Sequence, residues 1–366
     1  MKIVTVVGAR PQFIKAAIVS KGLAENNFDE FLIHTGQHFD KNMSDVFFEE
    51  LGMDQPALNL GIVESSHAAQ TGRMMMELEK AFIEQKPGCV LVYGDTNSTI
   101  AAALAAAKLH IPVAHVEAGL RSFNRKMPEE LNRIVTDQLS DVMYSTSPVA
   151  SKHLENEGIT KERIVEVGDV MFDAILHYSQ VLEANPEKGS ALARSGEFVL
   201  ATIHRAENTD NPDRLRNIFD VLVSLSEKMK VILPLHPRTR KTLDVLKLME
   251  HYGEKINFVD PVGYLGMIDL MKNASLVATD SGGVQKEAYY LKTPCVTFRD
   301  ETEWVETIER GANRLLAPER PLNELISEAK ESVFQGFQDN GADLLYGGGQ
   351  ATKAIVEDLL TRYAGR

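Results

Sequence analysis

Cysteine is scarce in this sequence, and long apolar runs are absent. Only Cys89 and Cys295 occur among 366 residues, and each lies at the start of a predicted buried strand. Two isolated thiols favour neither a disulfide framework nor a metal site, so we interpret both as core residues. No apolar run reaches the roughly 18 residues needed to span a bilayer, and the N-terminus enters a strand without a signal-peptide layout. We therefore expect a cytoplasmic protein without a metal site.

Basic residues are also in the minority. The sequence has 39 Lys and Arg residues and 52 Asp and Glu residues, which gives a formal net charge of −13. A nucleic acid or an anionic membrane would reward a basic face, so we expect neither partner, although a few local cations can still hold a small anion. With 44% hydrophobic residues, the chain is globular and long enough for two domains of roughly 100–200 residues each.

Three carboxylates follow strand ends or a helix start within residues 90–133. Asp95 follows an apolar run and precedes a capped, alanine-rich helix, and Glu117 ends a second apolar run. Glu129 follows Pro128, which suits the first position of a helix. Open α/β sheets bind ligands at the carboxyl ends of their strands, so this layout predicts an active site. Helix capping and the helix dipole also favour acids at such positions, but they explain the three together less well.

Two cations follow the first predicted strand, residues 3–7. Arg10 lies in the turn after this strand, and Lys15 follows about one helical turn later. The turn lacks the full glycine fingerprint of a dinucleotide-binding unit, so it supports dinucleotide binding only weakly. The two side chains can hold an anionic ligand, and the alternative is a pair of solvated surface cations.

A second series of strands and helices follows a linker candidate at residues 184–190, which combines Pro, Gly and polar residues. Its strand ends carry polar side chains that include His204, Arg205 and His236. A later strand runs into Ser281-Gly282-Gly283, and free N–H groups at such a helix start bind phosphate oxygens. Glu287, about one turn further on, could reach the ribose of the same ligand. A plain tight turn is the alternative interpretation.

Together these motifs resemble, from end to end, those of the non-hydrolysing UDP-N-acetylglucosamine 2-epimerases. The matching segments are Gly8-Ala9-Arg10-Pro11 with Lys15, Gly94-Asp95-Thr96, Val116-Glu117-Ala118-Gly119-Leu120-Arg121, Pro128-Glu129-Glu130 with Asn132-Arg133, His204-Arg205-Ala206-Glu207-Asn208, and Ser281-Gly282-Gly283 with Gln285 and Glu287. Each segment is common alone, but the ordered set is highly specific. The resemblance implies an α/β fold of the glycosyltransferase-B type, with two Rossmann-like domains facing a cleft, and a homodimer.

The two strand–helix series and this resemblance together predict a division of the chain into three parts. We expect a Rossmann-like domain at residues 1–184 that carries the carboxylates, and a second Rossmann-like domain at residues 185–349 that binds UDP. Residues 350–366 are expected to form a terminal helix that packs back on the first domain.

The resemblance also implies the chemistry. UDP leaves C1 as the C2 hydrogen is removed, a glycal forms, and UDP adds back after protonation on the other face. No cofactor is implied, because the C1 leaving group replaces oxidation in labilising C2. The resemblance implies four catalytic residues, Asp95, Glu117, Glu129 and His204, and it leaves open which is the base and which is the acid. The resemblance further implies that the substrate is bound by Arg10, Lys15, Arg121, Arg133, Arg205, His236, Ser281, Gly282, Gly283 and Glu287.

The motifs are compatible with more than one sugar on the UDP substrate. Residues 121–127 form a shorter and more basic loop than in many family members, and this form resembles the branch that acts on UDP-2,3-diacetamido-2,3-dideoxy-glucuronate. Extra cations there could meet a C6 carboxylate. A glycosyltransferase of the same fold is the alternative enzyme, but it would not need Asp95, Glu117 and Glu129 together. A UDP-sugar-binding regulatory protein would need only the features of the second domain.

Overall fold

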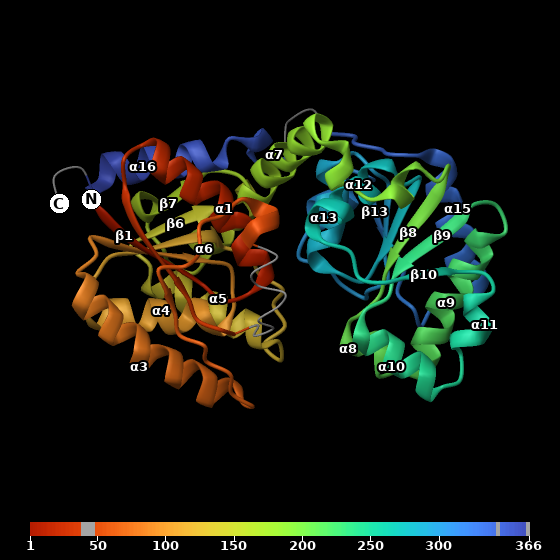
Figure 1. Cartoon of the computed structure of the whole chain (residues 1–366), viewed down its shortest axis with the longest axis horizontal. Coiled ribbons are helices and arrows are strands. Elements are labelled where there is room, and N and C mark those ends of the chain that lie inside the picture. The colour runs from red at the N-terminus through yellow and green to blue at the C-terminus, as the bar shows by residue number, and fades with distance from the viewer. Residues whose placement is uncertain (38–47, 342–344, 364–366) are drawn as a thin grey trace. The chain divides into compact units, whose positions relative to one another are not determined.

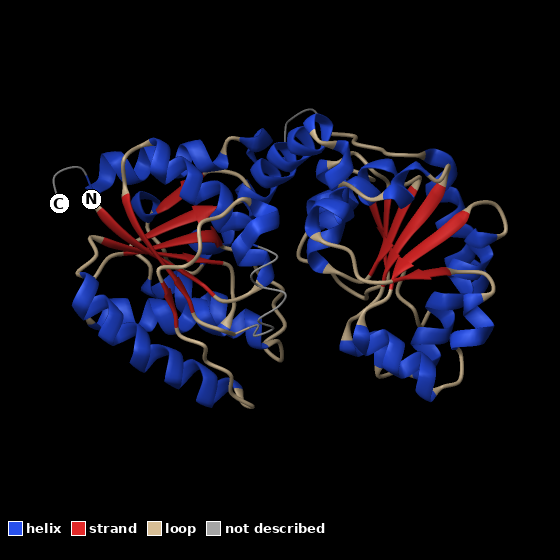
Figure 2. Cartoon of the chain, viewed as in Figure 1, coloured by secondary structure: helices blue, strands red, loops and turns tan. Residues whose placement is uncertain are grey.

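The computed structural model describes residues 1–37, 48–341 and 345–363. The chain forms two compact units, Met1–Leu176 with Leu344–Arg366, and His177–Asp343. Each unit is a parallel sheet covered by helices (Figures 1 and 2). The boundary between the units follows Leu176, inside helix α7 (Val170–Ala184), and so comes before the linker candidate at 184–190. Helix α7 continues unbroken across this boundary.

The sheet of the first unit has the strand order β3-β2-β1-β4-β5-β6-β7, and every pair is parallel. The strands are β1 (Lys2–Val7), β2 (Asp29–His34), β3 (Leu58–Asn59), β4 (Cys89–Tyr93), β5 (Val113–Ala118), β6 (Val142–Ser145) and β7 (Ile164–Glu166). The order reverses direction between β1 and β4. The carboxyl ends of these two strands therefore flank a topological switch point, where such sheets bind their ligands.

Helices cover both faces of this sheet (Figure 1). Besides the start of α7, the described helices are α1 (Arg10–Glu25), α3 (His67–Gln85), α4 (Asn97–Lys108), α5 (Pro128–Leu139), α6 (Pro148–Asn156) and α16 (Ala351–Tyr363), with 3-10 turns η1 (Lys161–Arg163) and η4 (Leu345–Gly349). The alanine-rich helix α4 packs against both α3 and α5. Its small side chains leave room for two neighbouring helices, which fixes the turn between β4 and α4.

The C-terminal helix α16 belongs to the first unit. It packs against α1, where a Cβ atom added at Gly22 would lie 2.9 Å from Cγ2 of Thr352. The carboxylate of Asp173 on α7 accepts hydrogen bonds from the backbone N–H groups of Ala351 (3.1 Å) and Thr352 (2.6 Å). These bonds satisfy two N–H groups of the first helical turn, which have no partner within the helix.

The sheet of the second unit repeats the same plan, with parallel strands in the order β10-β9-β8-β11-β12-β13. The strands are β8 (Phe198–Thr202), β9 (Lys230–Pro234), β10 (Asn257–Val259), β11 (Leu276–Thr279), β12 (Cys295–Thr297) and β13 (Asn313–Leu315). The switch point of this sheet lies between β8 and β11. Each unit therefore has the Rossmann strand order that the motifs implied.

The helices of the second unit complete its two outer layers. Those described are α8 (Ala206–Thr209), α9 (Pro212–Ser226), α10 (Pro237–Val245), α11 (Met249–Gly253), α12 (Tyr264–Asn273), α13 (Gly282–Tyr290), α14 (Val305–Glu309) and α15 (Leu322–Gln335), with 3-10 turns η2 (Pro186–Lys188) and η3 (Ala191–Arg194). Within the described ranges, no helix is both long and apolar enough to cross a membrane.

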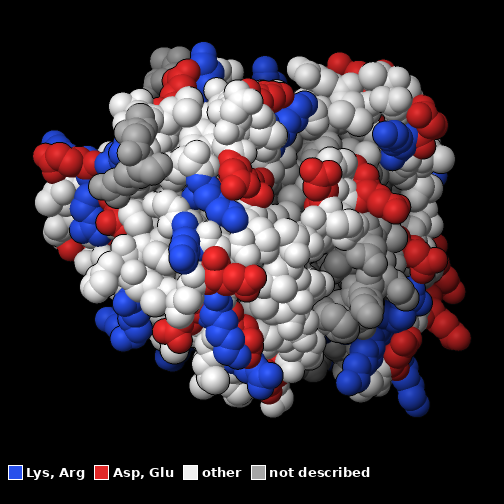
Figure 3. All heavy atoms as spheres, turned by 60° about the vertical axis from the view of Figure 1, so that its left-hand side comes forward, with Lys and Arg blue, Asp and Glu red and all other residues white. Residues whose placement is uncertain are grey.

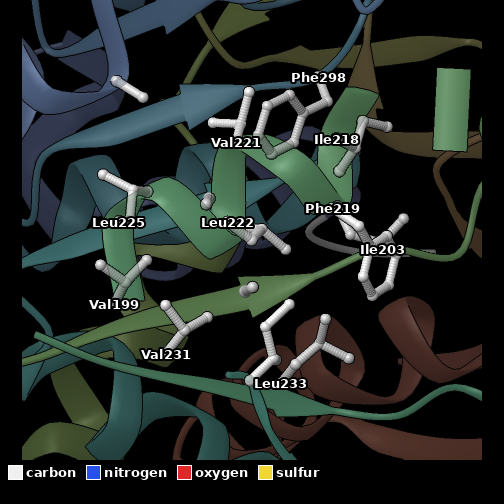
Figure 4. Close-up of a cluster of buried hydrophobic side chains, with 14 of the residues drawn as sticks. Val199, Ile203, Ile218, Phe219, Val221, Leu222, Leu225, Val231, Leu233 and Phe298 are labelled. Carbon is white, nitrogen blue, oxygen red and sulfur yellow. The ribbon is translucent and has the colours of Figure 1, made fainter. Parts of the chain in front are cut away.

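One apolar core of this unit joins helix α9 to the sheet (Figure 4). The side chains labelled in the figure are Val199, Ile203, Ile218, Phe219, Val221, Leu222, Leu225, Val231, Leu233 and Phe298. All of them are buried, and full burial of one large apolar side chain contributes roughly 1.5–3 kcal/mol. The end of β8, from which the next loop begins, is therefore held in a packed core. Cys89 and Cys295 are buried and unbonded, as core thiols should be.

Candidate active site

Two acids and two cations meet at the switch point of the first unit. Asp95 lies in the turn between β4 and α4, and Glu117 lies near the end of β5. Lys15 of α1 forms an ion pair with Glu117, and Nη2 of Arg133 on α5 donates to Oδ2 of Asp95 at 2.5 Å. The fold thus brings together four of the predicted site residues, from α1, β5, α5 and the turn after β4.

The Asp95 carboxyl has an environment suited to proton transfer. Burial raises its pKa above the ordinary value, the charge of Arg133 opposes this rise, and the charge of Glu117 adds to it. The side chain of Asp95 is still 29% exposed, so a ligand can reach it. A carboxyl with a raised pKa beside a second carboxylate is a candidate acid–base group.

Glu117 is held in an unusual backbone conformation. Its φ is +71°, in the left-handed region that residues other than glycine rarely adopt, and the register between β5 and β6 shifts at this residue. Such bulges re-aim a side chain, and strain of this kind costs of order 1–3 kcal/mol. The neighbouring Gly94 has φ +59°, and a Cβ atom there would lie 3.3 Å from Oε2 of Glu117. Both the backbone conformation and the space beside Glu117 therefore favour a glycine at position 94.

Arg121 does not join this cluster, although it was predicted to bind substrate. Its side chain is 1% exposed; the guanidinium donates to Glu157 at 2.6 and 2.7 Å and lies 2.7 Å from Asp137. Nδ1 of the buried His115 lies 2.7 Å from the other oxygen of Asp137, and Nε2 lies 2.7 Å from the Gly94 carbonyl. Arg121 therefore belongs to a buried network that supports the turn carrying Asp95, because its charge is matched by Asp137 of α5 and by Glu157 at the end of α6.

This network keeps Asp137 ionised. Burial alone would raise the pKa of this carboxyl, but the hydrogen bond and charge of His115, and those of Arg121, outweigh burial and bring the pKa below its ordinary value. The side chain of Asp137 is fully buried, and the Gly119 N–H also donates to it at 3.2 Å. A buried carboxylate with this set of partners acts as a fixed structural anion.

The paired glutamates of α5 have different roles in the structure. Glu130 is 1% exposed and accepts hydrogen bonds from the backbone N–H groups of Ser122 and Phe123, each at 2.9 Å, and from Arg133 at 3.1 Å. It thereby ties the loop at 121–127 to the Arg133–Asp95 ion pair. Glu129 is exposed on the first turn of α5, and Arg10 is exposed on the first turn of α1.

At the switch point of the second unit, the His204 turn is bound to Asp280. This carboxylate is fully buried and accepts from the backbone N–H groups of His204 and Arg205, each at 3.0 Å, and from Nδ2 of Asn208 at 3.1 Å. Nδ1 of His204 also lies 3.1 Å from Asp280. Asp280 was not among the predicted site residues, although its place directly after a buried strand was a signal for it.

His236 lies beside His204, with the ring centroids 5.4 Å apart. Its Nδ1 accepts from the Arg238 N–H at 3.1 Å and so caps helix α10. Burial lowers the pKa of His236, and the charge of His204 lowers it further.

The turn Ser281-Gly282-Gly283 forms the start of helix α13, as its sequence predicted. Oγ of Ser281 caps the helix at the Val284 N–H, and the first N–H groups of a helix have no partner within it. Beneath Gly282 lies the buried Arg299, whose Nη1 would be 3.6 Å from a Cβ atom at that glycine and 2.9 Å from Glu303. Glu287 is buried on the second turn of α13. The turn therefore combines a helix N-terminus with a nearby guanidinium, which suits an anion.

Other charged side chains are distributed without one dominant sign on the face drawn in Figure 3, where basic and acidic groups are interspersed. Near the second switch point, Arg205 forms an ion pair with Glu207 at 3.7 Å. In the part of the chain that the structure describes, no group of three or more His, Cys, Asp or Glu side chains is arranged to hold a metal ion.

The fold and the two switch points define an α/β protein of the glycosyltransferase-B type with two Rossmann-like units. Residues 21–360 match the family described as UDP-N-acetylglucosamine 2-epimerase. The chain belongs to this family. The family resemblance drawn from the motifs is thus confirmed, and so is the predicted α/β class with a parallel sheet in each unit.

Individual relatives cover the whole chain. The chain is 51% identical to the UDP-2,3-diacetamido-2,3-dideoxy-D-glucuronate 2-epimerase of Pseudomonas aeruginosa, over 98% of this chain and 99% of that protein. It resembles the structure of the UDP-GlcNAc 2-epimerase of Methanocaldococcus jannaschii in complex with UDP-GlcNAc and UDP, with a TM-score of 0.89, 41% identity, and coverage of 99% and 100%. The structure of the Neisseria meningitidis enzyme bound to UDP-GlcNAc gives a TM-score of 0.87 at 30% identity, with the same coverage.

Proposed function

We propose that this protein is a non-hydrolysing 2-epimerase of a UDP-N-acetyl sugar. The observation that carries the proposal is the cluster at the first switch point, where the carboxylates of Asp95 and Glu117 are paired with Arg133 and Lys15. A glycosyltransferase would need a nucleotide site but no pair of acid–base carboxylates. Membership of the 2-epimerase family supports the same conclusion.

The reaction begins with an elimination. A carboxylate removes the proton from C2, the electron pair forms the C1–C2 double bond, and the C1–O bond breaks with its electrons on the departing diphosphate. In the reverse sense, a second group protonates C2 on the opposite face and the diphosphate adds back to C1. Asp95, Glu117 and Glu129 are the acid–base candidates for the two faces of C2, while Lys15 holds Glu117, Arg133 holds Asp95, and both cations stabilise charge.

The second unit supplies the groups for the nucleotide. The N–H groups of Ser281-Gly282-Gly283 suit the diphosphate, and Glu287 is assigned to the ribose. His204 is assigned to a phosphate oxygen of the leaving group, with Arg205, His236 and the exposed Arg10 of the first unit as further anion-binding side chains. The reaction needs no redox cofactor, because the bond to the diphosphate activates C2.

For the sugar, we propose a 2,3-diacetamido uronate. The support is the 51% identity to the enzyme named for that substrate and the exposed cations Arg125 and Lys126, which suit a C6 carboxylate. UDP-N-acetylglucosamine is the second candidate, because the structural relatives in complex with it share the fold over 99% of this chain.

The deciding experiment compares turnover of the two nucleotide sugars by the purified protein. We expect kcat/KM to be roughly 10- to 100-fold higher for the uronate, because a charge-assisted contact contributes about 1.5–3 kcal/mol. The variant R125M/K126M should lose most of this preference and leave kcat/KM for UDP-N-acetylglucosamine unchanged. A wild-type preference for UDP-N-acetylglucosamine would reject the uronate. Failure to epimerise either sugar would reject the proposed reaction.

A homodimer in the cytoplasm is also proposed. The apolar side chains of Met76 and Ile83 on α3 are 56% and 58% exposed in the single chain, so this helix is a candidate for the interface. Sedimentation analysis should give a dimer for the wild-type protein and a weaker dimer for M76E/I83E. A monomer at micromolar concentration of the wild-type protein would contradict this proposal.

A further inference from the structure

Asp280 is a buried carboxylate placed between two parts of the second switch point. It follows β11 and directly precedes Ser281, the first residue of the anion-binding turn. Its own N–H donates to the Thr202 carbonyl at 3.1 Å, which ties it to the end of β8. A buried charge is costly unless it is paired, and the partners of Asp280 lie mainly in the turn that begins at His204. The carboxylate therefore connects the imidazole to the phosphate-type turn.

The hydrogen bonds of Asp280 define the imidazole tautomer. All its close polar neighbours in the His204 turn are N–H donors, so the carboxylate acts as an acceptor, and Nδ1 of His204, 3.1 Å away, must carry a hydrogen. Nε2 is then the atom left for a ligand, and the ring is 39% exposed. A carboxylate behind an imidazole fixes the orientation of the ring and stabilises its protonated form, as in the Ser-His-Asp arrangement.

Asp280 and His236 are the titratable groups that lie next to His204. Burial alone would raise the pKa of Asp280, but the hydrogen bond and charge of His204, with the Arg205 N–H and Asn208, outweigh burial and lower the pKa. The pKa of His236 is lowered by burial and by the charge of His204; the charge of Asp280 opposes this and the charge of Arg238 adds to it. Asp280 is therefore an ionised acceptor beside Nδ1 of His204.

We propose that Asp280 is a positioning residue that acts through His204 on the leaving group. It holds Nδ1–H so that Nε2–H faces the diphosphate oxygen released from C1. Nε2 donates its proton to that oxygen when the C1–O bond breaks, and it takes the proton back when the diphosphate adds again. This inference rests on the proposed function, because it requires departure of the diphosphate. It adds a carboxylate that the family motifs in the sequence did not single out.

The test is a double-mutant cycle of D280N and H204N. Each single variant should lower kcat about 100- to 10,000-fold, the range of a positioned general acid. In the H204N background, D280N should change kcat by less than about threefold, because the residue through which Asp280 acts is already gone. If the loss of kcat in the double variant equals the product of the two single losses, the proposal is overturned. A carboxylate with a merely structural role would lower kcat independently of His204. UDP affinity, measured by calorimetry, should change by less than about threefold in D280N.

A pH profile and a matched control make the test specific. Removal of the Asp280 charge should move the His204 limb of the kcat profile to lower pH, because the imidazolium loses its stabilising anion. N208A removes a different hydrogen bond to Asp280, so its melting temperature should fall while the limb stays in place. An unmoved limb in D280N would overturn the inference. Full activity of H204N would instead refute the assigned role of His204 in the proposed function.

Discussion

A methyl group at position 94 tests the geometry of the carboxylate cluster. In G94A the added Cβ atom would lie 3.3 Å from Oε2 of Glu117 and 3.9 Å from Nζ of Lys15. The first distance is tighter than ordinary contact, so Glu117 must shift by a few tenths of an ångström. A misplacement of about 1 Å can cost ~100-fold in rate, so we expect a loss of roughly three- to tenfold in kcat. The positive φ should also cost about 1–2 kcal/mol of stability.

Gly61 provides the matched control for this variant. Its φ is +58°, against +59° for Gly94, but a Cβ atom there would meet nothing within 4 Å. G61A should therefore lose a similar free energy of unfolding in urea and keep its kcat. Equal losses of kcat in the two variants would refute the reasoning, because backbone strain alone would then explain both. Full activity of G94A would refute the placement of Glu117.

Three further predictions concern the cations and the buried network. R133M removes the charge that holds down the pKa of Asp95, so the acidic limb of the kcat profile should move to higher pH, whereas R216M on the surface should leave it unchanged. R121M should lower the free energy of unfolding by about 3–5 kcal/mol and leave UDP affinity intact, because it breaks a buried pair; weaker UDP binding at unchanged stability would restore Arg121 to the ligand site. The pKa of Asp137 is lowered in the folded state, so the stability difference between wild type and D137N should be full above pH ~4 and shrink on acidification below it; a difference independent of pH would contradict this.

The clustering of the first site could be predicted because parallel strands bring their carboxyl ends to one edge. Asp95 and Glu117 each come after an apolar run, so their meeting follows once the strands are recognised. Helix α3 also follows local signals, because Ser66 caps its first turn and its apolar side chains recur at helical spacing. Periodicity and strand ends are local signals, and they were sufficient for these elements.

The features that were missed depend on contacts between distant residues. Arg121 carries a charge that suits a phosphate, and nothing local shows that Asp137 and Glu157 surround it in the fold. The left-handed backbone of Glu117 has no sequence signal either, because residue type alone argues against it. Asp280 was visible as a strand-end residue, but its link to His204 depends on the adjacency of β8 and β11 in the sheet.

The most direct measurement of the central claim is solvent isotope incorporation at C2. With the preferred UDP-sugar in D₂O, elimination and re-addition predict deuterium at C2 of both epimers at equilibrium, observed by NMR, and D95N should slow this incorporation at least about 100-fold. Epimerisation with the original hydrogen retained at C2 would contradict the account, because the C2–H bond must break before the carbon can be inverted.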